Sequence, residues 1–386
     1  VDFHRQATSD DETTANGAPN AVWRILTDNY TNVARFRGVT IETQDDEGIQ
    51  SFSRAFLDRN QPLLRRRQSE RRIRECHGDL HTDHIYFTQP LVIVDCIEFN
   101  RQFRYCDTAS DLAFLAMDID FHGRPDLSRY VVDRYVALSN DIELRRLLPF
   151  YQCYRAYVRG KVDSLRSVEP EIEASERTLA AASARKHFDL AYRYTWTARP
   201  ALILVAGLSG SGKSVIAGTM RQRIGFRVLS SDAVRKELAA LAPSTQARDY
   251  DAGLYTPAHT KRTYDTLFER AEQELKLGNG VILDATFQRR SDRNTARSLS
   301  QRAGVPLLLV ECRATEAVTR RRLDARAARG NSVSDADWQI FLEQRKRFET
   351  IADDESADGM VIDTDADAEQ LARRILAVLQ IRVDSL

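Results

Sequence analysis

The sequence predicts an α/β fold in two parts: a mostly helical domain over residues 1–197, and a domain over residues 198–386 whose parallel sheet is flanked by helices. The first observation is that, from Pro200 onward, short branched-aliphatic runs alternate with helix-length segments, which is typical of βαβ units around a buried parallel sheet. The second is a glycine-rich loop directly after the first of these runs. The third is a series of long amphipathic helical patterns between residues 107 and 195.

Composition and charge narrow the class of protein. The chain of 386 residues has no apolar run near the length of about eighteen residues that a membrane-spanning helix needs, so we expect a globular protein without a membrane partner. Acidic residues are interleaved with the arginines and the formal net charge is zero, which does not favour a nucleic-acid surface. Five cysteines without a C-x-x-C pair predict no disulfide framework and fit the reducing cytoplasm. The first residue, Val1, indicates a trimmed or processed chain, and the oligomeric state stays open.

The expected elements follow from local patterns. Residues 6–20 are polar and punctuated by Gly and Pro, so we expect a loop there. After it we expect a helix near residues 20–35, a helical pattern over 48–74 with a break at Pro62, the loop CHGDLHTDH over 76–84, and strands over 85–87 and 91–95. The domain boundary is expected within residues 196–200, and the strands of the parallel sheet within ALILVAG, FRVLSS, GVILDAT, PLLLVEC and MVIDTD.

A phosphate-binding loop is predicted where the sequence reads G-x-x-x-x-G-K-S. Its glycines let consecutive backbone N–H groups turn toward phosphate oxygens, and the helix that follows adds a positive dipole. In this pattern Lys213 would reach the β- and γ-phosphates of ATP, and Ser214 would bind Mg²⁺. The alternative is a flexible Gly/Ser loop, which the strand before the motif and the helix after it do not favour. The residues expected to bind the nucleotide are Gly207, Leu208, Ser209, Gly210, Ser211, Gly212, Lys213 and Ser214.

Asp284 indicates how the nucleotide is used. It ends an aliphatic run and has no Glu behind it, whereas motor-type ATPases usually place a Glu there to polarise water. An N-K-x-D base reader of the kind found in switch GTPases is also missing from the sequence. Both features favour phosphoryl transfer to a bound acceptor, because a kinase must keep water away from the transferred group.

Two further segments are candidates for catalysis. Asp232 follows the second aliphatic run, so it would lie at the crevice of an open sheet and could take the proton of an acceptor hydroxyl. Arg235, one helical turn on, could hold an acceptor anion, but Asp232 could also be a helix N-cap. An arginine that closes over ATP would neutralise charge on the transferring phosphoryl group. The candidates for this role are Arg322, Arg326 and Arg329.

Residues 201–380 resemble the P-loop kinases grouped with polynucleotide kinase, zeta toxin and gluconate kinase. The resemblance is carried by GLSGSGKS, by S-D-x-x-R over residues 231–235, by D-A-T-F after the third aliphatic run, and by the arginine-bearing segment. It implies an ATP-dependent kinase in which Asp232 is the general base and Arg235 binds an acceptor phosphate. Substrates differ widely across this grouping, so the resemblance leaves the acceptor unidentified.

Residues 75–165 resemble the catalytic lobe of aminoglycoside and choline phosphotransferases. In this resemblance Asp79 of H-G-D-L-H is the catalytic-loop Asp, Asp95 is the metal-binding Asp, and Asp107 with Asp111 match a downstream acidic helix. His84 stands where that family has Asn, which replaces an oxygen ligand of Mg²⁺ by a nitrogen. No segment before residue 75 resembles the nucleotide-clamping lobe of that family.

Three interpretations of this possible second site, with Asp79, His84 and Asp95, stay open. The lobe could be a degraded or truncated kinase with a structural or acceptor-binding role, or an active half that residues outside this chain complete. It could also hold a transition metal. The residues that crowd this loop are His77, Asp79, His81, Asp83 and His84. The two resemblances in tandem are similar to bacterial proteins described as bifunctional aminoglycoside phosphotransferase/ATP-binding proteins.

Together these features predict a cytoplasmic phosphotransferase that moves the γ-phosphoryl group of ATP, with Mg²⁺, to a hydroxyl of a small-molecule acceptor. Phosphate affinity is expected in residues 207–214 alone. One alternative is an ATP-binding regulatory or scaffolding module with negligible turnover. Another is a nucleic-acid 5′-hydroxyl kinase, which zero net charge and few interleaved aromatic residues do not favour.

Overall fold

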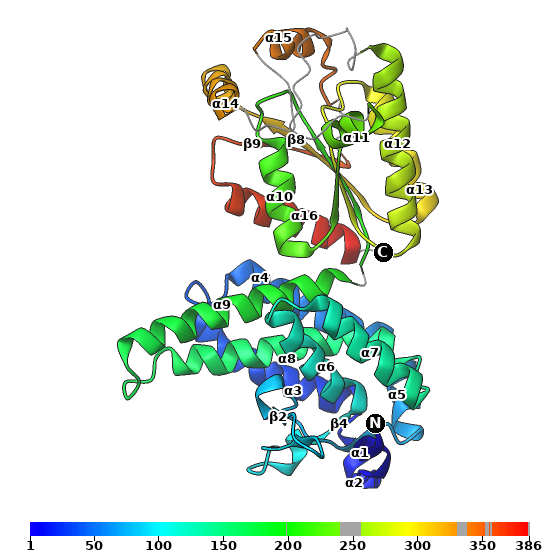
Figure 1. Cartoon of the computed structure of the whole chain (residues 1–386), viewed down its shortest axis with the longest axis vertical. Coiled ribbons are helices and arrows are strands. Elements are labelled where there is room, and N and C mark those ends of the chain that lie inside the picture. Colours follow the sequence, from blue (N-terminus) through cyan, green and yellow to red (C-terminus); the bar gives the residue numbers. More distant parts are fainter. Residues whose placement is uncertain (198, 240–255, 330–337, 352–354, 356, 385–386) are drawn as a thin grey trace. The chain divides into compact units, whose positions relative to one another are not determined.

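The computed structural model describes residues 1–197, 199–239, 256–329, 338–351, 355 and 357–384. They form two units, Val1–Thr195 (unit 1) and Trp196–Leu386 (unit 2), shown in Figure 1. In the part of the chain that is described, no helix combines the length and the apolar character that crossing a membrane requires.

Unit 1 is mostly helical. Its central helix is α6 (Thr108–Phe121), which packs against α7 (Pro125–Ser139) and α8 (Leu144–Arg166) and is buried along most of its length. Two small antiparallel sheets accompany the helices, β1 (Ile73–Glu75) with β4 (Tyr105–Asp107) and β2 (Ile85–Tyr86) with β3 (Val92–Ile93). The other helices are α1 (Asp2–Gln6), α2 (Asp11–Ala15), α3 (Pro19–Val33), α4 (Thr43–Arg59), α5 (Gln61–Ser69) and α9 (Ala174–Thr197).

Two expectations for unit 1 were wrong in detail. The segment 6–20 is not all loop, because Asp10 caps α2 by accepting a hydrogen bond from the backbone N–H of Thr13 at 2.8 Å. The helical pattern breaks at Asn60 and not at Pro62, because Pro62 lies in the first turn of α5, where a missing N–H removes no helical hydrogen bond.

Unit 2 contains a five-stranded sheet whose strands are all parallel, in the order β6-β7-β5-β8-β9. Three strands lie within the expected aliphatic runs, whereas β8 ends one residue after its run and β9 begins one residue before its run. The expected α/β fold class is confirmed. The central strand is buried at every position, as expected for a sheet covered on both faces. The strands are β5 (Leu202–Ala206), β6 (Arg227–Ser230), β7 (Val281–Asp284), β8 (Leu307–Arg313) and β9 (Gly359–Asp363).

Helices cover both faces of this sheet (Figure 1). On one face α10 (Lys213–Ile224) packs against α16 (Ala368–Asp384). On the other face α11 (Ser231–Leu238), α12 (Pro257–Lys276) and α13 (Arg290–Ala303) enclose a core with Leu204, Leu283 and Leu309. Two further helices, α14 (Glu316–Arg329) and α15 (Trp338–Arg347), belong to the same unit. The carboxyl ends of β5, β6 and β7 therefore meet at one edge of the sheet, where open α/β sheets form their crevices.

Candidate active site

Residues 207–214 (the phosphate loop) follow β5 and include the first two residues of α10, and at three positions their backbone is one that only glycine adopts easily. Gly207, Gly210 and Gly212 have φ values of 139°, 79° and 86°. A Cβ atom at Gly207 would lie 2.4 Å from the carbonyl oxygen of Cys312, so this position also has no room for a side chain. The three glycines thus shape a tight turn that ends at the N-terminus of α10.

Distant segments hold the phosphate loop in place. The backbone N–H of Ser209 donates to Oε1 of Gln344 in α15 at 2.9 Å, and the carbonyl oxygen of Ser211 accepts from the hydroxyl of Thr364 at 2.7 Å. Within the loop, Nζ of Lys213 donates to the carbonyl oxygen of Leu208 at 3.0 Å. Gln344 and Thr364 were not predicted as site residues, although Thr364 lies in the run MVIDTD, where a strand was predicted.

A cavity of about 700 Å³ opens at this edge of the sheet (the active-site cavity). It brings together the predicted residues Lys213, Ser214, Asp232, Arg235, Asp284 and Arg326. Of the other predicted loop residues, Ser209, Gly210 and Gly212 also line it, whereas Gly207, Leu208 and Ser211 are not among the lining residues that the structure describes. The cavity is also lined by three residues of α12 that were not predicted from the sequence, Lys261, Tyr264 and Phe268.

The three candidate arginines of α14 have different surroundings. Arg326 lines the active-site cavity. Arg322 instead donates to Oγ1 and to the carbonyl oxygen of Thr364, at 3.0 and 2.6 Å, and so supports the residue that holds the phosphate loop. The side chain of Arg329 lies outside the described residues. Arg326 is therefore the described arginine of this helix that can reach a bound ligand.

Asp284 ends β7 at the floor of the site and is 6% exposed. Burial raises the pKa of its carboxyl group above the usual range, although the Lys213 ammonium and the Ser214 hydroxyl act against this shift. The charge of Asp232 adds to the increase in the Asp284 pKa. The Ser214 hydroxyl and the Asp284 carboxylate together provide the oxygen donors that Mg²⁺ prefers.

Asp232 and Arg235 form an ion pair on α11. The Arg235 guanidinium donates to Oδ1 of Asp232 at 2.8 Å, and both side chains line the active-site cavity. The N-cap of α11 is Ser230, and Asp232 lies inside the first turn, so the N-cap alternative for Asp232 was wrong. The ion pair instead fixes the direction of a carboxylate that faces the cavity.

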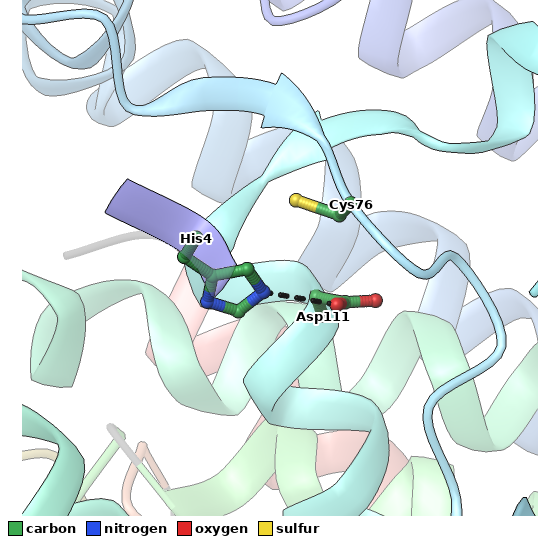
Figure 2. A group of neighbouring side chains, drawn as sticks. All are labelled: His4, Cys76 and Asp111. Carbon is green, nitrogen blue, oxygen red and sulfur yellow. Dashed lines mark hydrogen bonds and ion pairs between the residues drawn. The ribbon is translucent and has the colours of Figure 1, made fainter. Parts of the chain in front are cut away.

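In unit 1, Asp111 anchors the loop that contains Asp79. One carboxylate oxygen accepts from the backbone N–H of Gly78 at 2.9 Å, and the other accepts from the N–H of His77 at 3.2 Å. The second oxygen also contacts Nε2 of His4 at 3.0 Å, and Figure 2 shows this contact as a dashed line. Burial by itself would raise the pKa of Asp111, but the bond to His4 and nearby positive charge lower it below the usual range. Although Cys76 lies beside this pair, the carboxylate is already engaged, which indicates a structural role.

Asp107 also has a structural role. Its two carboxylate oxygens accept from the buried guanidinium of Arg67 at 2.6 and 2.7 Å, and the same guanidinium binds Asp141. One oxygen of Asp107 also accepts from the backbone N–H of Ala109 at 2.8 Å and caps α6. The two acidic residues of the predicted downstream helix, Asp107 and Asp111, therefore hold unit 1 together.

The three residues of the possible second site do lie close together. Nδ1 of His84 lies 2.9 Å from the carbonyl oxygen of Asp79, and Nε2 of His84 lies 3.3 Å from the carboxylate of Asp95. His81, on the same loop, lies 3.5 Å from the Asp79 carboxylate. Burial would raise the pKa of Asp79, but hydrogen bonding and charge from His81 outweigh it and lower the pKa. His77 contacts the carbonyl oxygen of Val94 through Nε2, at 2.8 Å.

The fold and the site define a P-loop protein, and residues 202–351 match the family model described as an AAA domain, AAA_33. Over 347 residues the chain is 32% identical to the uncharacterized proteins Rv2004c of Mycobacterium tuberculosis and Mb2027c of Mycobacterium bovis. The alignment covers 89% of this chain and 68% of each relative. The chain belongs to the family of these mycobacterial proteins.

Solved structures similar to part of this chain include a sugar kinase from Janibacter sp., with 21% identity and a TM-score of 0.37 over 47% of this chain and 95% of that chain. A gluconokinase from Sinorhizobium meliloti matches with 19% identity and a TM-score of 0.36 over 48% of this chain and 95% of that chain. The APS kinase of Mycobacterium tuberculosis in complex with AMPPNP and APS matches with 22% identity and a TM-score of 0.35, over 47% and 98%. The resemblance of unit 1 to aminoglycoside phosphotransferases stays a prediction.

Proposed function

We propose that unit 2 is an ATP-dependent phosphotransferase that moves the γ-phosphoryl group of ATP to a hydroxyl group of a small molecule. The observation that carries the proposal is the active-site cavity, which places the phosphate loop and the Asp232–Arg235 pair in one enclosure. Its volume of about 700 Å³ suits a nucleotide or metabolite better than a polymer surface. The five cysteines are unpaired, which agrees with a cytoplasmic location.

In this proposal the phosphate loop binds the triphosphate. The backbone N–H groups at the start of α10 and the Lys213 ammonium would hold the phosphate oxygens, and Arg326 would neutralise charge on the transferring group. Ser214 and Asp284 would hold Mg²⁺ through oxygen atoms, and that ion, when bound, supplies positive charge to the β- and γ-phosphoryl oxygens. Both residues line the cavity beside Lys213, so the donor set fits the ion.

The acceptor would bind on the side of α11. Asp232 takes the proton of the acceptor hydroxyl while the oxygen of that hydroxyl forms a bond to the γ-phosphorus. The bond between that phosphorus and the β–γ bridging oxygen breaks, and ADP leaves with the electron pair of that bond. Arg235 keeps the carboxylate of Asp232 directed at the cavity through their contact of 2.8 Å. Walls of α12 such as Tyr264 and Phe268 would keep water from the transferred group.

The test is ATP consumption by the full chain against a panel of sugars, aminoglycosides, nucleosides and 5′-hydroxyl oligonucleotides. One class of small molecule is expected to stimulate ADP formation and to gain a phosphoryl group. Lys213→Ala should lower this turnover at least about a hundredfold, the scale of losing one preorganised electrostatic contact. The matched control is Lys276→Ala, because Lys276 is an exposed lysine of α12 that pairs with Glu272.

Three results would overturn the proposal or a part of it. Full turnover in the Lys213→Ala variant would show that the phosphate loop is not the catalytic site. ATP binding without transfer to any acceptor class would instead favour the regulatory or scaffolding module. Phosphorylation of the oligonucleotides alone would replace the small-molecule acceptor by a nucleic acid.

A further inference from the structure

A second group of potential ligands lies in unit 1, outside the active-site cavity. Asp79, His81 and His84 each offer one ligand atom, and these three atoms all lie within 4.8 Å of one another. Asp95 lies next to them, with its carboxylate 3.3 Å from Nε2 of His84. Asp79, His81 and His84 lie on the segment between β1 and β2, and Asp95 follows β3.

The protonation of His84 follows from its hydrogen bond. Nδ1 lies 2.9 Å from the carbonyl oxygen of Asp79, and a carbonyl oxygen can only accept, so Nδ1 carries the hydrogen. In the neutral ring Nε2 then has a lone pair, which faces an oxygen of the Asp95 carboxylate at 3.3 Å. Nε2 is therefore the atom of His84 that can bind a metal ion.

Two of the spacings match the separation of ligand atoms in a tetrahedral metal site. With bonds of about 2.1 Å, as zinc makes to histidine nitrogen and carboxylate oxygen, two ligand atoms stand about 3.4 Å apart. The separation between His84 Nε2 and Asp95 is 3.3 Å, and that between His81 Nε2 and Asp79 is 3.5 Å. The bond from His84 to a backbone carbonyl is the outer contact that metal-binding histidines usually make through their other nitrogen.

The backbone around this group is fixed by buried contacts. Asp111 accepts from the N–H groups of His77 and Gly78, and the Arg155 guanidinium donates to the carbonyl oxygen of Gly78 at 2.9 Å. The N–H of Val94 donates to the carbonyl oxygen of His84 at 3.1 Å, which places the next residue, Asp95, beside the imidazole. Such outer contacts give a site its geometry before a ligand arrives.

We propose that unit 1 binds one divalent transition-metal ion of the zinc, cobalt or nickel class through Asp79, His81 and His84, with the exposed side chain of Asp95 turning toward the ion. Two imidazole ligands favour these ions over Mg²⁺, which prefers oxygen donors. His81 is buried and the Asp95 side chain is 77% exposed, so the ion would be held from one side by the protein and reached from solvent on the Asp95 side. The site is independent of the kinase activity proposed for unit 2.

The test is titration of the full chain, without a tag and without nucleotide, with Co²⁺ followed by visible absorption and with Zn²⁺ followed by calorimetry. We expect one ion per chain, tetrahedral Co²⁺ absorption bands that Zn²⁺ removes, and weaker binding as the pH falls and the imidazoles take up protons. His81→Gln and His84→Gln should each weaken binding at least about tenfold. Asp95→Asn, at a side chain that is 77% exposed, should weaken it as well.

The matched control is Asp83→Asn, because Asp83 is a highly exposed carboxylate on the same loop, 3.9 Å from His81. It should bind Co²⁺ and Zn²⁺ like the unchanged chain. No binding of either ion would overturn the proposal. Binding that survives in the chain with both His81→Gln and His84→Gln would also overturn it, as would a preference for Mg²⁺ over Zn²⁺.

Discussion

At the scale of residues, a substitution of Asp232 distinguishes a phosphotransferase from a module that only binds nucleotide. Asp232→Asn preserves size and shape but removes the capacity to accept a proton, so ATP affinity should survive while phosphoryl transfer falls by about a hundredfold or more. The measurement is calorimetric ATP binding beside single-turnover transfer to the acceptor found in the panel. Glu237→Gln is the control, because Glu237 is an exposed carboxylate of the same helix that pairs with Arg270. Transfer at the unchanged rate in the Asp232 variant would rule out its role as the base.

Replacing Asp284 is expected to lower the activity of unit 2 and to raise its stability. Its pKa is raised in the folded state, so the ionised carboxylate lowers the stability of unit 2 at any pH above the ordinary Asp value of 3.8. This penalty is absent below the unfolded pKa and develops as the pH rises through the folded pKa. Asp284→Asn should therefore raise the melting temperature at pH 7, with an advantage that shrinks toward pH 4, while turnover falls by about a hundredfold or more.

The check on Asp284 is thermal unfolding of both chains across this pH range. A lower melting temperature for the variant at pH 7 would mean that the contacts of the carboxylate with Lys213 and Ser214 outweigh its burial.

At the scale of residues, the sequence predicted what a local motif encodes. The phosphate loop can be read from its glycines and its lysine, because their function follows from adjacent positions. The supports of that loop could not be read in this way, since Gln344 and Thr364 lie 135 and 153 residues from their partners. The role of Asp232 was ambiguous, because a residue directly after a strand can be either the N-cap of the next helix or a general base at the edge of the sheet.

At the scale of elements, Asp111 stabilises the loop after β1, because its carboxylate holds the backbone N–H groups of His77 and Gly78. Asp111→Asn leaves one acceptor oxygen where two are in use and turns an NH₂ group toward a donor. Breaking such a buried charged network should lower the free energy of unfolding by about 3 kcal/mol. Urea unfolding of the full chain, followed by the fluorescence of the tryptophans, measures this loss.

The pH dependence of this variant gives an independent check. The pKa of Asp111 is lowered in the folded state, so its contribution is present above the ordinary Asp value of 3.8 and is lost as the pH falls through the folded pKa. The difference between the two chains should therefore shrink under acid conditions. Asp126→Asn, at an exposed carboxylate that pairs with Arg124, should leave stability almost unchanged. Equal stability of the Asp111 variant and the unchanged chain at pH 7 would contradict the anchoring role.

At the scale of elements, patterns of hydrophobicity predicted the long helices and the five parallel strands. The short helix α2 was missed because one cap residue and a turn of five residues give almost no periodic signal. The strand order could not be predicted from the pattern, since β5 pairs with β7 and β8 and not with the next strand along the chain. For the same reason the helices that wall the active-site cavity, such as α12, could not be assigned to it.

At the scale of the whole molecule, a phosphate-binding loop and a second loop that resembles a phosphotransferase catalytic loop raise the question of how many nucleotides one chain binds. Residues 207–214 have the required glycine backbone, a lysine and the start of a helix. The loop around Asp79 instead directs imidazoles and carboxylates at one another, and its backbone N–H groups at His77 and Gly78 are already taken by Asp111. Those two N–H groups therefore cannot bind a phosphate without releasing a buried carboxylate.

We therefore expect one ATP per chain in the presence of Mg²⁺. Lys213→Ala should abolish this binding although the loop around Asp79 is unchanged, because the cation that would neutralise the phosphates is lost. Asp79→Asn should bind ATP like the unchanged chain, because the active-site cavity has no contribution from Asp79. Calorimetric titration of the three chains measures both stoichiometry and affinity. Two ATP per chain, or Mg²⁺-dependent binding that persists in the Lys213 variant and disappears on adding Asp79→Asn, would place a second nucleotide site in unit 1.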